Sequence, residues 1–410
     1  MKLSYLAIAA LMLVSPTAAT AAKYRVLHNF GRGTDSKEPF GALAWDVRGN
    51  LYGVTGAGGP DKPCTPYGCG TAFKLAPRSD GSWQESVLHD FRGDRDGAYP
   101  YGTMVFDSYG NLYGTLVGGP SSGAGVFKLS SGTKGWSNAR IYTDGAGPGL
   151  MIDSLGNLYG EMGPGEQKGG AIGELSKGAG GWNYTALFSF DGTDGLTPEA
   201  PPIWDTKGDM LGTTLAGGIY GAPCWTYSGC GVVFKMTPDG NGTWTYRVLH
   251  TFASSKDDGQ SPSGGLVMDK LGNVYGTTDL GGRYDNGTVF KLAETGGHWE
   301  MTQIYDFPNC KYGCLPSGNL IFDTAGNLYG VASGGLPDCG YTCGVVFKLT
   351  PQENGKWKYS VLHKFSGPDG ALPGYGLAID NQGNLFGVTS SGGKYNFGVA
   401  FEISTTPSPQ

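Results

Sequence analysis

Three glutamates near the middle of the chain are the first candidates for chemistry. They are Glu161, Glu166 and Glu174. Carboxylates at this spacing could carry out acid–base catalysis or bind a cation. No paired histidine or aspartate marks a reacting centre beside them. We therefore favour the interpretation that this stretch is a divergent, solvated part of the fold, and keep the three glutamates as catalytic candidates only.

Aromatic residues in glycine-rich stretches are the candidates for ligand binding. Some lie between or beside paired cysteines and others in shorter stretches: Tyr67, Trp225, Tyr227, Tyr284, Tyr341, Tyr395 and Phe397. Rings held on stiff loops can stack on sugars or anchor a protein partner, because little conformational entropy is lost on binding. The alternative is that each ring packs on a neighbouring loop. For the set as a whole we favour ligand binding.

The eight cysteines fall into four local pairs, which are Cys64 with Cys69, Cys224 with Cys230, Cys310 with Cys314, and Cys339 with Cys343. An even number of closely spaced cysteines predicts disulfides in an oxidising compartment. The last four could instead supply four thiolates to a metal ion. Because no histidine lies near them, we expect neither a metal nor a cofactor. Four cysteines allow three pairings, so their connectivity stays open.

The N-terminus has the layout of a secretory signal peptide, residues 1–21. Lys2 precedes an apolar run from Leu3 to Val14, and small residues follow as far as Ala22. The run is shorter than the roughly 20 apolar residues of a membrane-spanning helix. We therefore expect cleavage after Ala21 rather than a membrane anchor. The mature protein is expected to be exported to the periplasm or the extracellular space, without inserting into a membrane.

The composition predicts an all-β fold. The chain has 74 glycines and only 16% charged residues. Short aromatic and β-branched runs separated by Gly and Pro favour strands, and no window keeps a helical period. The net charge of −6 argues against nucleic acid or an anionic membrane surface as a partner.

An eight-residue repeat, Asp-x-x-Gly-Asn-Leu-Tyr-Gly, must position all of these residues. It begins at Asp46, Asp107, Asp153, Asp205, Asp269, Asp323 and Asp380, and its Asp and both Gly occur in every copy. Self-similarity with a period of about 55 residues predicts a repeat architecture. A residue present in every unit usually serves the unit. We therefore assign the seven aspartates to tight turns rather than to catalysis or calcium binding.

Each unit contains four strand-like runs. Around Asp269 the runs are predicted over residues 263–268, 273–278, 287–292 and 299–307. Seven tandem units of this kind predict one domain, a seven-bladed β-propeller over residues 22–403, with a short polar tail at 404–410. Residues 24–30 match the fourth strand of other units, whereas the last unit stops after a third strand. We therefore expect the N-terminal strand to complete the last blade and close the ring.

The loops of such a propeller lie on two unlike faces. Loops between second and third strands, and loops between blades, share the face around the channel mouth, and in this chain they hold the cysteine pairs and the candidate aromatic residues. Blade-to-blade loops share Asp-Gly-x-x-Pro, beginning at Asp96, Asp194, Asp258 and Asp369, and this repetition favours a structural role. We expect function on the cysteine-bearing face. A closed ring has no edges for a partner to cover, so we expect a monomer.

The remaining motifs do not identify an enzyme. Four of the five histidines share one outer-strand position: His28, His89, His250 and His363. No nucleophile elbow, phosphate-binding loop or His-Glu-x-x-His motif is present. Because propellers host many functions, two hypotheses stay open. We favour a binding or scaffold module that recognises a glycan, a peptide or another envelope component. The alternative is a polysaccharide or antibiotic lyase or hydrolase, using acidic or tyrosine side chains at the channel mouth.

A family resemblance agrees with the propeller. It is carried by Gly272-Asn-Val-Tyr-Gly-Thr-Thr278, Gly281-Gly282, Gly287-Thr-Val-Phe-Lys-Leu292 and Val248-Leu-His-Thr-Phe252. These units resemble the GloVer tandem repeats of bacterial choice-of-anchor proteins, and the resemblance covers nearly the whole mature chain. It implies an exported propeller whose C-terminal attachment signal varies between members. We recognise no such signal before Gln410, and the resemblance implies no defined activity.

Overall fold

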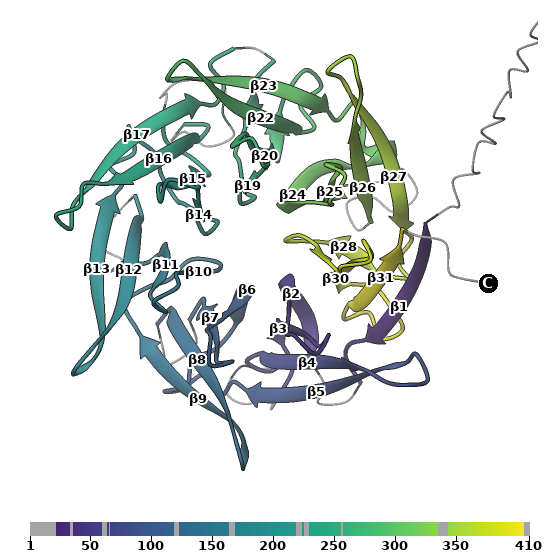
Figure 1. Ribbon diagram of the computed structural model, residues 1–410. Coiled ribbons are helices and arrows are strands. Elements are labelled where there is room, and N and C mark those ends of the chain that lie inside the picture. Colours follow the sequence, from purple (N-terminus) through teal and green to yellow (C-terminus); the bar gives the residue numbers. More distant parts are fainter. Residues whose placement is uncertain are drawn as a thin grey trace, which may run out of the picture.

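The computed structural model describes residues 22–32, 36–59, 64, 66–118, 123–163, 169–218, 224, 229–255, 257–334 and 343–405. In this part of the chain the regular structure is β-strand, apart from the 3-10 turn η1 (Cys310–Tyr312). The strands form antiparallel blades around a central axis (Figure 1). The prediction of an all-β, seven-bladed propeller is confirmed. Among the described residues, no helix has the length and apolar character needed to cross a membrane.

Each of the first six blades has four strands that follow one another from the channel outwards. Blade 1 contains β2 (Lys37–Trp45), β3 (Leu51–Ala57), β4 (Thr71–Pro77) and β5 (Trp83–Asp90). Blade 2 contains β6 (Pro100–Phe106), β7 (Leu112–Leu116), β8 (Gly125–Gly132) and β9 (Gly135–Tyr142). Blade 3 contains β10 (Met151–Ile152), β11 (Leu158–Glu161), β12 (Ala171–Gly178) and β13 (Gly181–Ser189).

The next three blades repeat this order. Blade 4 contains β14 (Ile203–Trp204), β15 (Met210–Thr214), β16 (Val232–Pro238) and β17 (Trp244–Thr251). Blade 5 contains β19 (Val267–Met268), β20 (Val274–Thr278), β22 (Thr288–Thr295) and β23 (His298–Asp306), with β18 (Gly259–Gln260) and β21 (Leu280–Gly281) paired beside it. Blade 6 contains β24 (Cys314–Phe322), β25 (Leu328–Gly334), β26 (Gly344–Pro351) and β27 (Trp357–Phe365).

The seventh blade is built from both ends of the chain. Its inner part is β28 (Ala371–Pro373) and β29 (Ala378–Ile379), followed by β30 (Leu385–Ser391), β31 (Val399–Ser404) and finally β1 (Lys23–Asn29). Strand β1 pairs antiparallel with β31, placing Tyr24 opposite Ile403. In Figure 1 the purple N-terminal strand lies along the outside of the yellow last blade. The predicted ring closure is therefore confirmed.

The repeat aspartate organises the turn between the first two strands of its blade. In blade 2, one carboxylate oxygen of Asp107 accepts the backbone N–H groups of Tyr109 and Asn111, both at 2.9 Å. The other accepts the Asn111 side-chain amide at 2.7 Å and the Tyr113 hydroxyl at 3.0 Å. Gly110 completes the turn with φ +78°, a conformation that glycine adopts without strain. The aspartates are turn formers, as predicted.

The second glycine of the repeat makes room for the core. A Cβ added at Gly276 would lie 2.5 Å from the ring of Phe290, so only glycine lets this fully buried ring fill the blade. Phe252, at the end of the preceding blade, meets Phe290 edge-on at 5.3 Å between centroids. In blade 3 the phenylalanine is absent, and the ring of Tyr184 comes within 2.4 Å of a Cβ added at Gly173. This blade is packed differently.

The outer-strand histidines contact the aspartates of the Asp-Gly-x-x-Pro loops. His89 lies 3.0 Å from Asp96, and His250 lies 3.0 Å from Asp258. A third such pair joins β27 to the next loop, with His363 2.9 Å from Asp369. The interaction repeats from blade to blade at the rim, far from the channel. Both motifs are therefore parts of the scaffold.

The innermost strand of blade 5 is shorter than the sequence predicts. In blade 5 the regular strand covers only Val267–Met268 instead of residues 263–268. The backbone N–H of Gly265 does not join a ladder, because it donates to the side chain of Asn319 in the next blade at 2.7 Å. Side chains and backbone groups of neighbouring blades thus meet around the channel, and this irregular layer positions the candidate site.

Candidate binding site at the channel mouth

The residue six positions before each repeat aspartate belongs to the innermost part of its blade. In chain order these residues are Phe40, Tyr101, Gly147, Glu199, Ser263, Ser317 and Gly374. Five of them, from five different blades, line one cavity of about 380 Å³: Tyr101, Glu199, Ser263, Ser317 and Gly374. Ligand pockets typically measure roughly 300–1,000 Å³. One repeated backbone position thus brings different side chains to one small pocket.

Glycines at the next position let the inner strands approach one another. A Cβ added at Gly41 would lie 2.3 Å from the carbonyl oxygen of Gly102, and one added at Gly318 would lie 2.2 Å from the carbonyl carbon of Tyr375. Any side chain would collide with backbone there. Gly41 and Gly318 also line the cavity, so the close backbones of adjacent blades form part of its wall.

Tyr375 breaks this glycine pattern. Its φ is +69°, and at the same repeat position Gly41 has φ +86°, Gly102 +77° and Gly318 +73°. A left-handed backbone costs a residue with a side chain on the order of 1–3 kcal/mol, and such strain clusters at binding and catalytic sites. The strained tyrosine is therefore a first indication of function at the channel mouth.

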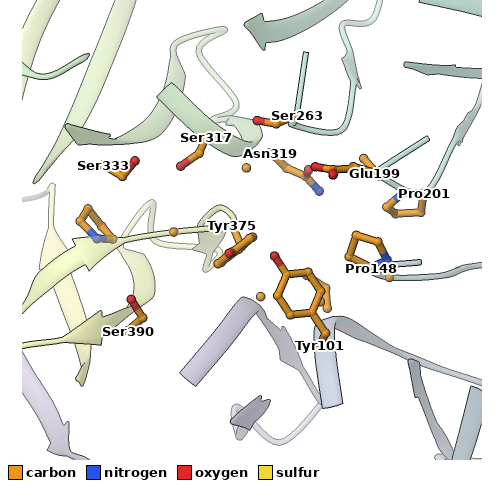
Figure 2. A pocket seen from close by; sticks show the side chains of 18 of the residues that line it. Tyr101, Pro148, Glu199, Pro201, Ser263, Ser317, Asn319, Ser333, Tyr375 and Ser390 are labelled. Atoms are coloured by element: carbon orange, nitrogen blue, oxygen red, sulfur yellow. The ribbon is translucent and has the colours of Figure 1, made fainter. Parts of the chain in front are cut away.

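Three aromatic rings from three blades meet beside the cavity. The centroids of Tyr101 and Tyr375 are 5.2 Å apart, and Phe40 lies 5.4 Å from the first and 5.6 Å from the second. Figure 2 shows Tyr101 and Tyr375 next to each other, with the Tyr101 hydroxyl directed into the central space. Burial raises the pKa of both hydroxyls. They therefore stay protonated and can donate hydrogen bonds.

Small polar side chains surround the rest of the cavity. They are Ser263, Ser317, Ser333, Ser390 and Asn319, and Figure 2 places them around one space. Ser333 and Ser390 lie 3.3 and 3.4 Å from backbone carbonyls to which they donate. Their oxygens can still accept hydrogen bonds, so this part of the wall offers acceptors at several points.

Two carboxyl groups complete the lining, Glu199 and Asp279. Asp279 accepts a hydrogen bond from the Ser263 hydroxyl. Burial raises the pKa of Asp279 to about 7; the Ser263 hydrogen bond opposes this shift, and the charge of Glu199 adds to it. Burial also raises the pKa of Glu199. No Lys, Arg or His occurs among the described residues that line the cavity, so this lining has no positive charge to balance the carboxylates.

Glu161 lies behind this wall, in the divergent blade 3. A Cβ added at Gly147 would lie 2.0 Å from its carboxylate oxygen, so the carboxylate occupies the space that a side chain at Gly147 would fill. Burial raises the pKa of Glu161 to about 7, and the charge of Glu199 contributes. Glu161 is thus electrostatically coupled to the cavity without lining it.

Glu174 does not join Glu161 there. Glu174 accepts a hydrogen bond from the Tyr159 hydroxyl at 3.1 Å, and the same hydroxyl lies 3.1 Å from the turn aspartate Asp153. Glu174 therefore belongs to the turn face of the blade. Glu166 lies outside the described residues. The structure separates two residues that the sequence placed in one cluster.

None of the candidate aromatic residues that the structure describes lines the cavity. Tyr67 is half exposed, and its centroid is 6.0 Å from that of Phe397. Tyr284 is also exposed, with the guanidinium of Arg283 5.7 Å from its ring centre. Lys394 lies 5.4 Å from the ring centre of Tyr395. Trp225, Tyr227 and Tyr341 lie outside the described residues.

Three of the expected disulfides are present: Cys64–Cys69, Cys224–Cys230 and Cys310–Cys314. The third settles the choice that the sequence left open for Cys310 and Cys314. Cys339 lies outside the described residues. Over the described ranges, no three His, Cys, Asp or Glu side chains are grouped so as to hold a metal ion.

Sequence reasoning missed most of the cavity: Tyr101, Tyr375, Glu199, Asp279 and the serines. The sequence-based candidates were taken from the loops, because the repeat units differ most in length there. The signal lay in aligned positions close to the repeat. The tenth residue after each repeat aspartate, for example, is Gly56, Val117, Gly163, Leu215, Asp279, Ser333 or Ser390. A single acid at such a position marks a departure from the unit.

Fold and site together define a seven-bladed β-propeller with a small polar pocket at its channel mouth. The chain belongs to the Gloeobacter/Verrucomicrobia repeat family, whose model matches residues 13–160 and 225–409. The family resemblance inferred from the repeats is thereby confirmed. A search of curated proteins finds no match.

Solved structures resemble the chain at low identity. A provisional oxidoreductase (glucose dehydrogenase) from Thermus thermophilus has 15% identity and a TM-score of 0.44, covering 93% of this chain and 100% of that chain. A provisional 6-phosphogluconolactonase from Bacteroides uniformis has 12% identity and a TM-score of 0.48, covering 79% and 87%. A protein of unknown function from Dyadobacter fermentans has 9% identity and a TM-score of 0.42, covering 93% and 99%. Similarity at this level carries no functional argument.

Proposed function

We propose that this protein is an exported binding propeller whose channel-mouth cavity holds a small polyhydroxylated ligand, such as the terminal unit of a glycan. The observation that carries the proposal is the joint lining of one cavity by two tyrosine rings, four serine hydroxyls and two carboxyl groups. A sugar ring presents an apolar face that can stack on an aromatic ring. Its hydroxyl groups pair with side-chain donors and acceptors, which fix its orientation.

The charge of the cavity restricts the class of ligand further. Glu199 and Asp279 accept hydrogen bonds when ionised, and the described lining has no cation to attract an anionic group. A phosphorylated or sulfated ligand would meet like charge there, which disfavours binding. A neutral sugar satisfies the carboxylates with its hydroxyls, and an amino sugar adds a favourable charge. The proposed ligand is therefore neutral or cationic.

The setting outside the cavity fits an exported protein. The three disulfides are of the kind that form and persist in oxidising compartments. They lie in the loops of the same face as the cavity, where they limit loop motion. A stiff rim loses little entropy when a ligand binds. This supports recognition in the periplasm or outside the cell.

A glycan array followed by calorimetry tests the proposal. We expect wild-type protein to bind at least one neutral or amino-sugar glycan. Tyr101→Ala should weaken that binding by about tenfold or more, since it removes a stacking surface and a hydroxyl donor worth roughly 1–2 kcal/mol together. Tyr284→Ala is the matched control, because Tyr284 is an exposed tyrosine that does not line the cavity. Absence of glycan binding, or a larger effect of Tyr284→Ala than of Tyr101→Ala, would contradict the proposal.

One observation also favours a second candidate, a glycan lyase or hydrolase. Asp279, with a pKa of about 7, is partly protonated at neutral pH and could act as a general acid, with Glu199 as the second carboxyl group. Incubating the bound glycan with the protein and analysing the products tests this candidate. Turnover that Asp279→Asn abolishes would establish catalysis, whereas an unchanged glycan after long incubation leaves binding as the function.

A further inference from the structure

We propose that a second subsite adjoins the channel-mouth cavity between blades 1 and 2, and that it binds the next ring of an oligosaccharide whose terminal unit enters the cavity. This inference rests on the proposed function, because it extends the same ligand. It changes the expected ligand from a single sugar to a chain of at least two rings. It also assigns a role to Tyr67, which does not line the cavity itself.

The subsite is a separate pocket of about 310 Å³ next to the cavity. Tyr101 lines both spaces, so one side chain forms the boundary between them. Phe40 also lines the second pocket and packs against both Tyr101 and Tyr375. A ligand leaving the cavity past Tyr101 therefore passes directly over further aromatic surface.

The lining of this second pocket suits a stacked ring. Four aromatic side chains contribute, Phe40, Tyr67, Tyr99 and Tyr101, together with Pro66 and Pro100. Tyr67 and Tyr99 are 51% and 37% exposed. Aromatic rings that only complete a core are buried, whereas these two keep a large part of their surface accessible. The only ionisable group among the described lining residues besides the tyrosines is Glu38.

The backbone around the two exposed tyrosines is held in place. The Cys64–Cys69 disulfide closes the loop that carries Tyr67, and both cysteines are buried. The Tyr67 carbonyl accepts from the N–H of Gly58 at 2.6 Å, and the N–H of Tyr99 donates to the Cys69 carbonyl at 2.8 Å. Both tyrosines are therefore tied to the same disulfide loop. Such preorganisation favours affinity, because little is lost in ordering the site.

The position of Tyr99 shows where this blade departs from its repeat. Its left-handed backbone, φ +54°, is shared by the equivalent residues Thr197, Ser261, Leu315 and Leu372. The conformation therefore belongs to the scaffold, and only the side chain differs. A tyrosine at this position adds a ring next to Tyr101 that the other blades lack. Tyr99 lines the second pocket together with Tyr101, at the junction with the cavity, where a sugar chain leaving the cavity would pass.

Calorimetry with ligands of increasing length tests the second subsite. The probes are glucose, cellobiose and cellotriose, and in parallel N-acetylglucosamine with its β1,4-linked dimer and trimer. For the series that binds, we expect the dimer to bind at least tenfold more tightly than the monosaccharide. Tyr67→Ala with Tyr99→Ala should remove this gain and leave the affinity for the monosaccharide unchanged. Tyr101→Ala should weaken both ligands, because Tyr101 lines both spaces.

The controls separate the two proposals. Tyr109→Ala, at an 85% exposed position on the opposite face, should leave both affinities unchanged, and thermal unfolding checks that every variant is folded. Equal affinity of wild-type protein for monosaccharide and dimer overturns the second subsite alone. So does a gain that persists in the Tyr67→Ala, Tyr99→Ala variant. Failure of wild-type protein to bind any member of either series overturns this inference, and failure across the whole glycan array overturns the proposed function as well.

Discussion

The two faces of the propeller use acidic residues in opposite ways. At the turn face, burial alone would raise the pKa of Asp107, but hydrogen bonds from Asn111, Tyr113 and Tyr109 more than offset it and lower the pKa. At the channel mouth, burial dominates and raises the pKa of Asp279 to about 7. The carboxylate in the turn accepts four hydrogen bonds, whereas the described contacts of Asp279 at the channel mouth include one, from Ser263. The repeated acid thus serves the fold, whereas the singular acid is one of the residues that we propose to bind the ligand.

The same contrast holds for the backbone. The turn glycines of the repeat adopt left-handed conformations in every blade, from φ +78° at Gly110 to +86° at Gly208. At the channel mouth, Tyr375 adopts such a conformation without being glycine. The turn face thus avoids strain by using glycine. The channel-mouth side accepts left-handed residues that carry side chains, at Tyr375 and at the repeated position of Tyr99. If this distinction is correct, substitutions on the two faces should affect different properties.

The largest effect is expected from the turn face. Asp107→Ala removes an acceptor of four hydrogen bonds, so the free energy of unfolding should fall by about 3–5 kcal/mol. The affinity of the folded protein for its glycan should not change. Chemical denaturation measures the first quantity and calorimetry below the unfolding transition the second.

Asp380→Ala provides the matched control. Asp380 accepts hydrogen bonds from the Gln382 and Asn384 backbone and from the Asn384 side chain. Phe386 occupies the position of Tyr113 in blade 2 and has no hydroxyl to donate. The loss of stability should therefore be smaller by roughly one hydrogen bond, about 1 kcal/mol. Equal losses in the two variants would contradict this account of the turn.

A pH effect is expected next, from the channel-mouth side. Glu161 and Asp279 have pKa values of about 7 in the folded protein, above the usual values of about 4.3 and 3.9 in unfolded chains. Between these limits the folded state holds protons that the unfolded state has lost, so its stability falls as the pH rises from about 4 to about 7. Above pH 7 these two groups contribute no further slope.

Glu161→Gln should remove part of this slope. At pH 8 the variant should be more stable than wild-type protein by at most about 4 kcal/mol, because the buried charge is gone. Thermal unfolding at pH 4, 6 and 8 measures the effect, and Glu300→Gln, at an exposed position, is expected to keep the wild-type profile. If wild type and Glu161→Gln show the same dependence of stability on pH, Glu161 is not coupled to the carboxyl groups of Glu199 and Asp279.

The third effect is on affinity rather than stability. Tyr375→Gly introduces the glycine that blades 1, 2 and 6 have at the equivalent position, as Gly41, Gly102 and Gly318. Relief of left-handed strain, on the order of 1 kcal/mol, should offset part of the packing lost with the ring, so the free energy of unfolding should fall only moderately. Glycan affinity should fall about tenfold in calorimetry. A strongly destabilised variant with unchanged affinity would make Tyr375 a core residue.

These contrasts also explain what could be predicted from the sequence. Seven copies of one phrase determine the blade, and matching residues 24–30 to other fourth strands predicts the closure of the ring. Repetition makes both visible. The cavity depends instead on which single residues meet after closure, and Tyr101 and Tyr375 are 274 positions apart in the numbering although their rings are in contact. The aromatic residues of the loops were visible because several of them adjoin cysteines, yet among the described candidates only Tyr67 lines the pocket beside the cavity.

The smallest effect comes from restoring the repeat in blade 3. Five of the other six blades have a lysine where Glu174 lies. Three of these lysines approach the tyrosine ring of the second strand, as Lys128 does with Tyr113 at 5.9 Å. In blade 3 the Tyr159 hydroxyl has one proton but two carboxylates within 3.1 Å, Asp153 and Glu174. Glu174→Lys should replace like-charge repulsion by attraction and stabilise the protein by about 0.5–1 kcal/mol.

Restoring the repeat residue near the channel mouth should affect binding rather than stability alone. Three other blades have threonine in place of Glu161, at Thr115, Thr213 and Thr277, so Glu161→Thr also restores the repeat. Because Glu161 interacts electrostatically with Glu199 at the cavity wall, we expect this variant to alter the pH dependence of glycan binding, while Glu174→Lys leaves it unchanged. Unfolding and binding titrations of both variants between pH 5 and 8 compare the two repairs directly. Equivalent behaviour would mean that divergence from the repeat, by itself, does not mark the site.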